Sequence, residues 1–228
     1  MDLTSYLLGK KASGGGGGGG DTPDLNDYFI TKINKNTSSA TGDYYQNLVK
    51  KTAPLELSSN VTSLTYCFYQ NQVDEIQFDK EKFDTSNITN MFGMFNGSKV
   101  KKLDLSSFNT ENVTDFQYMF QSCSELREVD ISSFTFKSNA KTSYMFYNAF
   151  KVTKIDMSGT TTVPSGQNKL ETFKTVGRDC LQSEGAYADG IPYVYVKNEA
   201  VQNYILSGTS NFRPSTWTTA NVVVKGSE

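Results

Sequence analysis

The amino-acid sequence predicts an α/β repeat solenoid, with a parallel β-sheet on one face, short helices or turns on the other, and non-repeating caps at both ends. Two observations support this prediction. The chain repeats at an interval of about 26 residues, and within each unit the spacing of apolar residues changes from strand-like to helix-like. A unit of this length cannot bury its own apolar side, so it has to stack against its neighbours, as the units of solenoid proteins do.

The repeat is anchored by phenylalanine. Four segments align, and their anchoring phenylalanines are 27, 25 and 26 residues apart: Phe68, Phe95, Phe120 and Phe146. An apolar pair follows each of them in nearly fixed register: Val73 and Ile76, Val100 and Leu103, Leu126 and Val129, Val152 and Ile155. Four matches at one period define the repeat region as residues 61–165.

Each unit contains a strand-like and a helix-like part. The segments KLDL, EVDI and KIDM alternate apolar and polar residues, which is the period of a short half-buried strand. The segment that follows spaces Val113, Phe116, Met119 and Phe120 as a helix does. We therefore expect the strands to form a parallel sheet on one face and one or two helical turns to form the opposite wall.

The two ends of the repeat region need covers, because an open solenoid end exposes core and unpaired strand edge. We expect an N-terminal cap over residues 21–60, in which DYFITKI and PLELSS look strand-like and GDYYQNLVKK looks helical. Over residues 166–228 we expect a strand–helix–strand cap, with LETF continuing the sheet, strands in IPYVYVK and NVVVK, and Asn198 as helix N-cap.

A short head precedes a run of seven glycines, Gly14 to Gly20, which we interpret as a flexible tether. Residues 1–13 can form about two turns of amphipathic helix. So short a helix is marginal in water, so it either docks on a partner or stays disordered. We expect docking, because a long tether is useful between two anchored bodies, and the anchoring side chains are then Leu3, Tyr6, Leu7 and Leu8.

Composition argues against catalysis. The chain has no histidine, which removes the commonest general base and the commonest zinc ligand. Its three cysteines, Cys67, Cys123 and Cys180, lie far apart and form no CxxC pair, and the first two fall at apolar repeat positions that favour buried thiols. No pair of carboxylates stands apart from the repeat. We expect no enzymatic activity, no cofactor and no metal.

Charge and hydropathy restrict the partners. The formal net charge is −2, and the one basic cluster, at Lys99, Lys101 and Lys102, fits a solvated edge, so we expect no nucleic acid. No apolar run reaches the roughly 18 residues of a membrane span. The first residues also lack the apolar stretch of a secretory signal, so we expect neither a membrane span nor export by the general secretory route.

Polar strand residues should stack from coil to coil, because parallel strands lie about 4.8 Å apart. One interpretation is a solvated surface with local turn bonding; the other is a binding face for a protein, a sugar or a weakly held calcium ion. The candidate binding residues are Glu75, Gln77, Lys102, Asp104, Ser106, Glu128, Asp130, Ser132, Lys154 and Asp156.

Aromatic residues offer a second candidate. Tyr66, Tyr118 and Tyr144 recur at one repeat position, where they could either stack against sugars or pack with the hydroxyl at the surface. Trp217, in a less regular segment, could be a binding hot spot or could pin the last cap.

The unit VTDFQYMFQSCSELREVDISSF resembles the BspA-like leucine-rich repeat, whose pattern runs roughly VTxMxxMFxxCxxLxxLDLSSF. The resemblance covers residues 61–158, and the first unit departs from it, with Gln77 in place of Asp and a longer DKEKF turn. The fourth unit lacks the VT pair and the closing Phe. The resemblance implies a leucine-rich-repeat-like fold and a role in adhesion or partner binding, since the family is found mostly on bacterial surface proteins.

The head, the tether, DLNDYF and the closing VYVKNEAVQNYI are similar to small proteins encoded among phage and prophage tail genes of Gram-positive bacteria. This second resemblance implies a virion component that is assembled in the host cytoplasm and released by lysis. Its repeats would contact a protein or glycan on the bacterial surface, and its N-terminal segment would contact other virion proteins. The alternative is a bacterial surface adhesin or a scaffold for protein–protein interaction.

Overall fold

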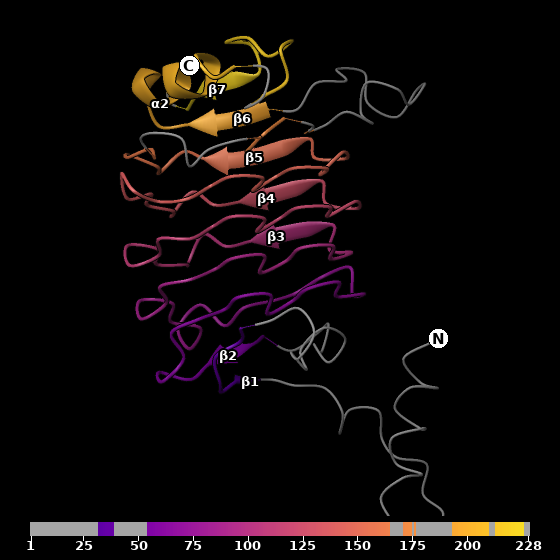
Figure 1. Ribbon diagram of the computed structural model, residues 1–228, viewed down its shortest axis with the longest axis vertical. Coiled ribbons are helices and arrows are strands. Elements are labelled where there is room, and N and C mark those ends of the chain that lie inside the picture. Colours follow the sequence, from indigo (N-terminus) through magenta and orange to yellow (C-terminus); the bar gives the residue numbers. More distant parts are fainter. Residues whose placement is uncertain are drawn as a thin grey trace, which may run out of the picture.

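A computed structural model of the chain describes residues 32–38, 54–164, 171–174, 176, 193–209 and 213–225. The predicted anchor (residues 1–13), the tether (14–20), the helix expected in GDYYQNLVKK and Cys180 lie outside these residues. Within them the chain winds into a parallel β-solenoid whose coils stack along one long axis (Figure 1).

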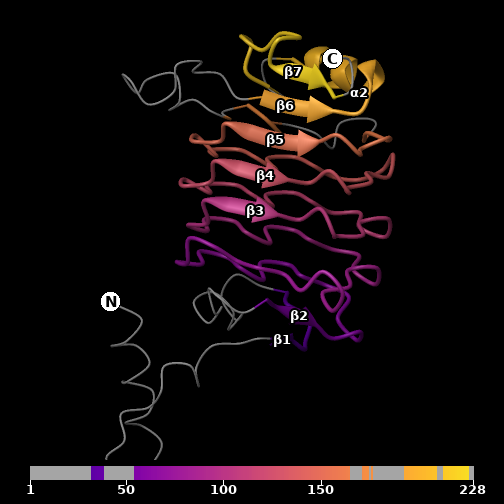
Figure 2. The ribbon, with the colours of Figure 1, turned by 180° about the vertical axis from the view of Figure 1, so that it is seen from behind.

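The predicted parallel sheet is confirmed. Five strands pair in sequence order, and Figure 2 shows them from behind as a single column: β3 (Lys102–Asp104), β4 (Glu128–Asp130), β5 (Lys154–Met157), β6 (Tyr193–Val196) and β7 (Val222–Val224). A separate parallel pair, β1 (Lys32–Ile33) and β2 (Glu56–Leu57), lies at the other end of the stack. Isolated bridges from Leu55 to Phe78 and from Glu75 to Lys102 join the two sheets into one column.

Of the two forms expected for the second wall, short helices or turns, the structure has turns, and the helical turns expected from the spacing are absent. Residues 54–164 contain no helix, and the segment after each strand forms consecutive tight turns instead. In the third repeat, for example, Met119 N–H donates to the carbonyl of Phe116, and Cys123 N–H donates to that of Phe120. Turns of this size also bring every third or fourth side chain inward, which is why the spacing imitates a helix.

Positive backbone φ angles recur at the third residue of these turns. They occur in pairs four residues apart, one pair per coil: Tyr66 and Gln70, Gly93 and Gly97, Tyr118 and Ser122, Tyr144 and Asn148. A bulky residue such as tyrosine rarely adopts this conformation. Hydrogen bonds between coils hold the turns in this conformation. The backbone N–H of each anchoring phenylalanine donates to a carbonyl of the next coil: Phe68 to Met94 (2.7 Å), Phe95 to Met119 (2.9 Å), Phe120 to Met145 (2.8 Å) and Phe146 to Thr172 (2.9 Å).

Inside the coils the anchoring phenylalanines form a continuous stack, which we call the phenylalanine spine: Phe68, Phe95, Phe120, Phe146 and Phe173. Successive ring centroids are 5.2, 5.6, 4.8 and 5.5 Å apart. The spine therefore extends one coil beyond the four predicted units. Its fifth member belongs to the segment LETF, whose described residues form a turn of the second wall rather than the predicted strand.

The two described cysteines are buried free thiols, as expected. Cys123 donates its S–H to the carbonyl of Phe95 at 3.0 Å, and burial raises the pKa of this thiol to about 12. Cys67 is fully buried beside the spine. Both act as small core residues.

Polar side chains at the coil edges bind the preceding coil. The side-chain amide of Asn112 donates to the carbonyl of Ser86 at 2.9 Å, and that of Asn87 donates to Ser59 at 3.3 Å. These bonds join residues 26 and 28 apart in sequence, so every coil is fastened to its neighbour at the edge as well as in the core.

At the C-terminal end the predicted strand, helix and strand are present as β6, α2 (Glu199–Leu206) and β7. Asn198 is the N-cap of α2, because its Oδ1 accepts the N–H of Val201 at 3.0 Å. The side chain of Gln202 donates to the carbonyl of Val222 at 2.6 Å. The helix thus uses part of the hydrogen-bonding capacity of the last strand, which restricts strand addition at this edge.

Trp217 pins this end rather than offering an exposed hot spot. Its side chain is 3% exposed, and its ring centroid lies 5.9 Å from that of Phe173, at the end of the spine. Arg213 donates to the carbonyls of Leu206 and Trp217, so the loop is bound to the end of α2.

Candidate functional site

The outward residues of the strand column form three rows on what we call the outer face of the sheet. Strand pairing places Lys102, Glu128 and Lys154 in one row, and the bridge from Glu75 to Lys102 adds Glu75 to it. The same pairing places Asp104, Asp130 and Asp156 in the second row, and a row of Ser106, Ser132 and Ser158 follows two positions later in each coil. The structure therefore brings the predicted binding residues onto one face. Whether this face binds a ligand stays a prediction.

Charges alternate along the first row and are paired within the chain. Lys102 Nζ lies 3.2 Å from Glu128 Oε2, and Gln77 Nε2 donates to Glu75 Oε1 at 2.8 Å. Lys154 Nζ lies 5.6 Å from the ring centroid of Tyr195, which follows in the next strand. Exposed pairs of this kind contribute little to stability, so they leave the face available for exchange with a ligand.

The aspartate row is held by local turn bonding, the first of the two interpretations. In each coil an aspartate Oδ1 accepts the backbone N–H of the serine two residues later, at 3.0, 2.9 and 3.0 Å for Asp104, Asp130 and Asp156. This is the geometry of an Asx turn. The carboxylates do not converge on a cation: the described residues contain no group of three or more Asp, Glu, Cys or His side chains that could hold a metal ion.

Asp156 is the most buried carboxylate of the row, with a side chain 9% exposed, and lies 3.0 Å from Lys225 Nζ. Burial alone would raise its pKa, but hydrogen bonds from Ser158 and the ion pair with Lys225 outweigh burial, so the pKa lies below the usual value of an aspartate. A carboxylate whose folded pKa is depressed stabilises the fold above its unfolded pKa, and this contribution is lost as pH falls through the folded value.

We expect Asp156→Asn to lower the free energy of unfolding by about 1 kcal/mol near neutral pH, because the ion pair with Lys225 is lost. The difference from the wild type should shrink as pH falls through the depressed folded pKa of Asp156, because the protonated carboxyl no longer pairs with Lys225. Urea unfolding from about pH 7 to pH 2 measures both. Asp130→Asn is the matched control, since Asp130 accepts the same serine bond and its electrostatic interaction with Lys225 is weaker than that of Asp156. A difference that persists at acid pH would contradict this assignment.

A groove of about 610 Å³ lies at the start of the outer face, between residues 74–80 and strand β3. Four predicted binding residues line it: Glu75, Gln77, Lys102 and Asp104. Six further lining residues were not predicted from the sequence: Asp74, Ile76, Phe78, Lys80, Lys101 and Ser107.

The groove is a consequence of the longer turn in the first repeat. Phe83 stacks on Phe108 with centroids 5.3 Å apart, so the two residues are equivalent. Phe83 follows Ile76 by seven residues, whereas Phe108 follows Leu103 by five. The two extra residues raise a wall, in which Asp79 Oδ1 accepts the N–H groups of residues 81 and 82, both at 3.0 Å. In the sequence this wall is marked by the segment DKEKF, which is longer than the SSF turn of the second and third repeats.

Ion pairs cross the groove and its rim. Lys80, in the raised turn, reaches Asp104 at 3.1 Å, and Lys101 lies 3.5 Å from Asp74. Lys80 and Asp104 have side chains 65% and 51% exposed. Both partners of this pair can therefore turn to a ligand at little cost.

The tyrosine strip does not form a platform for sugars. The rings of Tyr118 and Tyr144 lie 5.1 Å apart with an interplanar angle of 4°, so each covers a face of the other. The ring of Tyr66 lies over Gly93, where an added Cβ would be 2.4 Å from its Cε1. The strip is half-buried packing against the tight turns, the second of the two interpretations.

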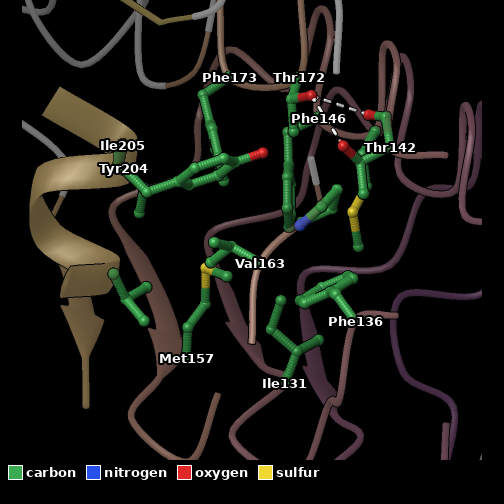
Figure 3. A pocket seen from close by; sticks show the side chains of 13 residues that line it. Ile131, Phe136, Thr142, Phe146, Met157, Val163, Thr172, Phe173, Tyr204 and Ile205 are labelled. Carbon is green, nitrogen blue, oxygen red and sulfur yellow. Dashed lines mark hydrogen bonds between the residues drawn. The ribbon is translucent and has the colours of Figure 1, made fainter. Parts of the chain in front are cut away.

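A small hollow lies beneath α2, between the last coils and the C-terminal end (Figure 3). Its walls are mostly apolar and include Phe146, Phe173 and Tyr204. Its volume of about 20 Å³ has room for about one water molecule, so it is a packing gap and not a ligand site.

Residues 58–178 match the family model described as "Mycoplasma protein of unknown function, DUF285". The match encloses the four repeats and the fifth member of the phenylalanine spine, and it spans more than half of the chain. No curated protein and no solved structure matches the chain. No helix among the described residues has the length and hydropathy needed to cross a bilayer.

Proposed function

We propose a function for this chain as a member of the family of mycoplasma proteins of unknown function, to which it belongs. It is a binding protein without enzymatic activity, and it holds its ligand on the outer face of the sheet. The groove is the observation that supports the proposal. It is the place where the regular coil is interrupted, and the interruption gathers exposed polar side chains from two coils around one hollow. Function in repeat scaffolds depends on such exposed residues and not on the fold.

The proposal predicts that the chain attaches to bacterial cells through the groove. We expect fluorescently labelled full-length protein to bind cells of the bacterium that carries the gene. The double variant Gln77→Ala, Lys102→Ala should bind at least about tenfold more weakly, a loss of roughly 1.4 kcal/mol. Flow cytometry over a concentration series measures the binding. Circular dichroism checks that the variant is folded, which we expect because both side chains are exposed.

The matched control is the double variant Glu111→Ala, Lys137→Ala. Both residues are exposed and neither lines the groove. This variant should leave binding unchanged. Equal binding by the groove variant and the wild type would refute the site. Absence of binding to these cells by the wild type would refute the proposed function itself.

For the location we propose a phage virion, as a tail-associated component that reaches the host surface. The support is the layout of the sequence, in which a short head and a glycine tether precede the repeats. The alternative is a surface adhesin or interaction scaffold of the bacterium itself, and its support is the resemblance of the repeat to the BspA-like repeat. Mass spectrometry of purified virions should detect the polypeptide if the first is right, and surface labelling of uninfected cells should detect it if the second is right.

A further inference from the structure

The groove carries equal numbers of opposite charges. Its lining includes three carboxylates and three lysines: Asp74, Glu75, Asp104, Lys80, Lys101 and Lys102. Each lysine already lies within 3.5 Å of a carboxylate, namely Asp104, Asp74 and Glu128 for Lys80, Lys101 and Lys102 respectively. A charged ligand of either sign would have to break one of these pairs and would meet repulsion from half of the rim.

A neutral hydroxyl group does not meet this difficulty. It donates to a carboxylate and accepts from an ammonium group, so one hydroxyl can bridge both members of an ion pair such as Lys80–Asp104. Two pairs, Lys80–Asp104 and Lys101–Asp74, have both members in the lining and can provide two such bridges. The rim therefore favours a ligand with many hydroxyl groups and no net charge.

The groove is lined by apolar as well as polar side chains. Phe78 is half-buried and Ile76 is buried, and both line the groove. The Phe78 ring packs edge-on against Phe83 and Phe108, at centroid distances of 4.7 and 5.0 Å, and also contacts two rings of the spine, so only part of it reaches the groove. Apolar walls with a few convergent polar groups are typical of small-molecule sites. A sugar ring matches this arrangement, because its faces carry C–H groups and its periphery carries hydroxyls.

The direction of the groove argues against a peptide. The groove runs parallel to β3 and to the neighbouring segment 75–78. Asp74 and Lys101 lie at its beginning, and Lys80 and Ser107 lie at its end. Four or five residues of strand correspond to about 15 Å. A peptide gains affinity at a sheet by pairing with a free strand edge. The groove lies on the face of the sheet, where strand pairing directs the main-chain hydrogen bonds to neighbouring coils.

From these observations we propose that the groove binds a short neutral oligosaccharide of the bacterial surface. This inference rests on the proposed function, since it names the ligand class of the same site. Lys80 and Asp104 bridge the sugar hydroxyls, and the exposed part of Phe78 forms an apolar floor beneath them.

The test uses the cells that the full-length chain binds. One portion is oxidised with mild periodate, which cleaves vicinal diols, one is treated with protease, and one is mock-treated. We expect periodate to lower binding at least about tenfold and protease to leave it unchanged. If both treatments lower binding, the protease-resistant glycan fraction released from the cells should compete with binding, and failure to compete overturns the proposal.

Lys80→Ala should weaken binding to mock-treated cells, whereas Lys82→Ala should not. Lys82 is the matched control because it lies in the same raised turn but pairs with Glu56 at 2.9 Å and does not line the groove. Binding that survives periodate but is lost after protease identifies a protein ligand, and binding that survives both excludes a saccharide. In either case the oligosaccharide is refuted while the proposed binding function stands.

Discussion

Phe120→Ala should lower the free energy of unfolding by about 3–5 kcal/mol. Phe120 is fully buried at the centre of the phenylalanine spine, with ring centroids of Phe95 and Phe146 at 5.6 and 4.8 Å. Truncation removes the transfer free energy of the ring and leaves a cavity between two rigid neighbours. Because a solenoid is stabilised by contacts between adjacent coils, both flanking interfaces weaken at once.

Urea unfolding measures this loss, and the single tryptophan makes it more informative. Trp217 lies at the end of the spine, so its fluorescence follows the C-terminal coils, whereas circular dichroism follows all of them. In the variant we expect the two transitions to separate. Phe92→Ala is the control, because Phe92 is only half-buried and lies between Tyr66 and Tyr118. This substitution should lower the free energy of unfolding by about 1 kcal/mol. Equal losses for the two variants would contradict the central role of the spine.

Gly159→Ala should destabilise the chain by about 2–3 kcal/mol through backbone crowding. An added Cβ at this position would lie 1.9 Å from the carbonyl oxygen of Ser132 in the preceding coil. A backbone carbonyl cannot turn aside as a flexible side chain can, so the two coils have to separate locally. The corresponding turns of the second and third repeats carry Ser107 and Ser133, so a Cβ is present at this place in both of those coils.

Gly97→Asn is the matched control for this substitution. Gly97 has a φ of +70°, but Asn148 occupies the equivalent place two coils later with a φ of +60°, and asparagine tolerates this conformation. The atom nearest to an added Cβ is Cγ of the flexible Gln70 side chain, at 3.2 Å, and the backbone of Gln70 lies at ordinary van der Waals distances of 3.8 and 3.9 Å. We expect a cost below about 1 kcal/mol in thermal or urea unfolding. A Gly159→Ala variant as stable as this control would show that the coils can separate freely.

The sheet could be predicted from the sequence because its signal is local and repeated. The alternation in KLDL, EVDI and KIDM specifies which side chains point outward, and a constant period specifies which of them are neighbours. The register of Lys102, Glu128 and Lys154 follows from these two facts alone. The helix at the C-terminal end was predictable for a similar reason, since Asn198 and the spacing of Val201 and Ile205 lie within one short segment.

The sequence could not decide between helices and turns for the second wall, because both structures share one spacing of inward residues. Val113, Phe116 and Phe120 point inward at intervals of three and four residues, both in a helix and in successive tight turns. The hydrogen bonds that decide between them connect different coils, such as Phe120 N–H to the carbonyl of Met145. Gly93 and Gly97 were the available signal, since both occupy positions with positive φ.

The groove itself was not predicted from the sequence, although four of its ten lining residues were predicted to bind. Glu75, Gln77, Lys102 and Asp104 were identified as members of repeating rows, whereas Lys80 was not, because it belongs to no row. Its place depends on how a two-residue insertion folds over the next strand, which the period of the repeat does not specify. The irregular residue thus completes the site that the regular residues begin.

The direction of the hydrogen bonds between coils has a mechanical consequence. Strand pairs and edge asparagines bond along the stack, so a force applied along the stack pulls these bonds apart one coil at a time. Each coil of about 26 residues that detaches lengthens the chain by about 90 Å. A protein held between two surfaces in flowing liquid would therefore lengthen in steps under load and rewind when the load falls.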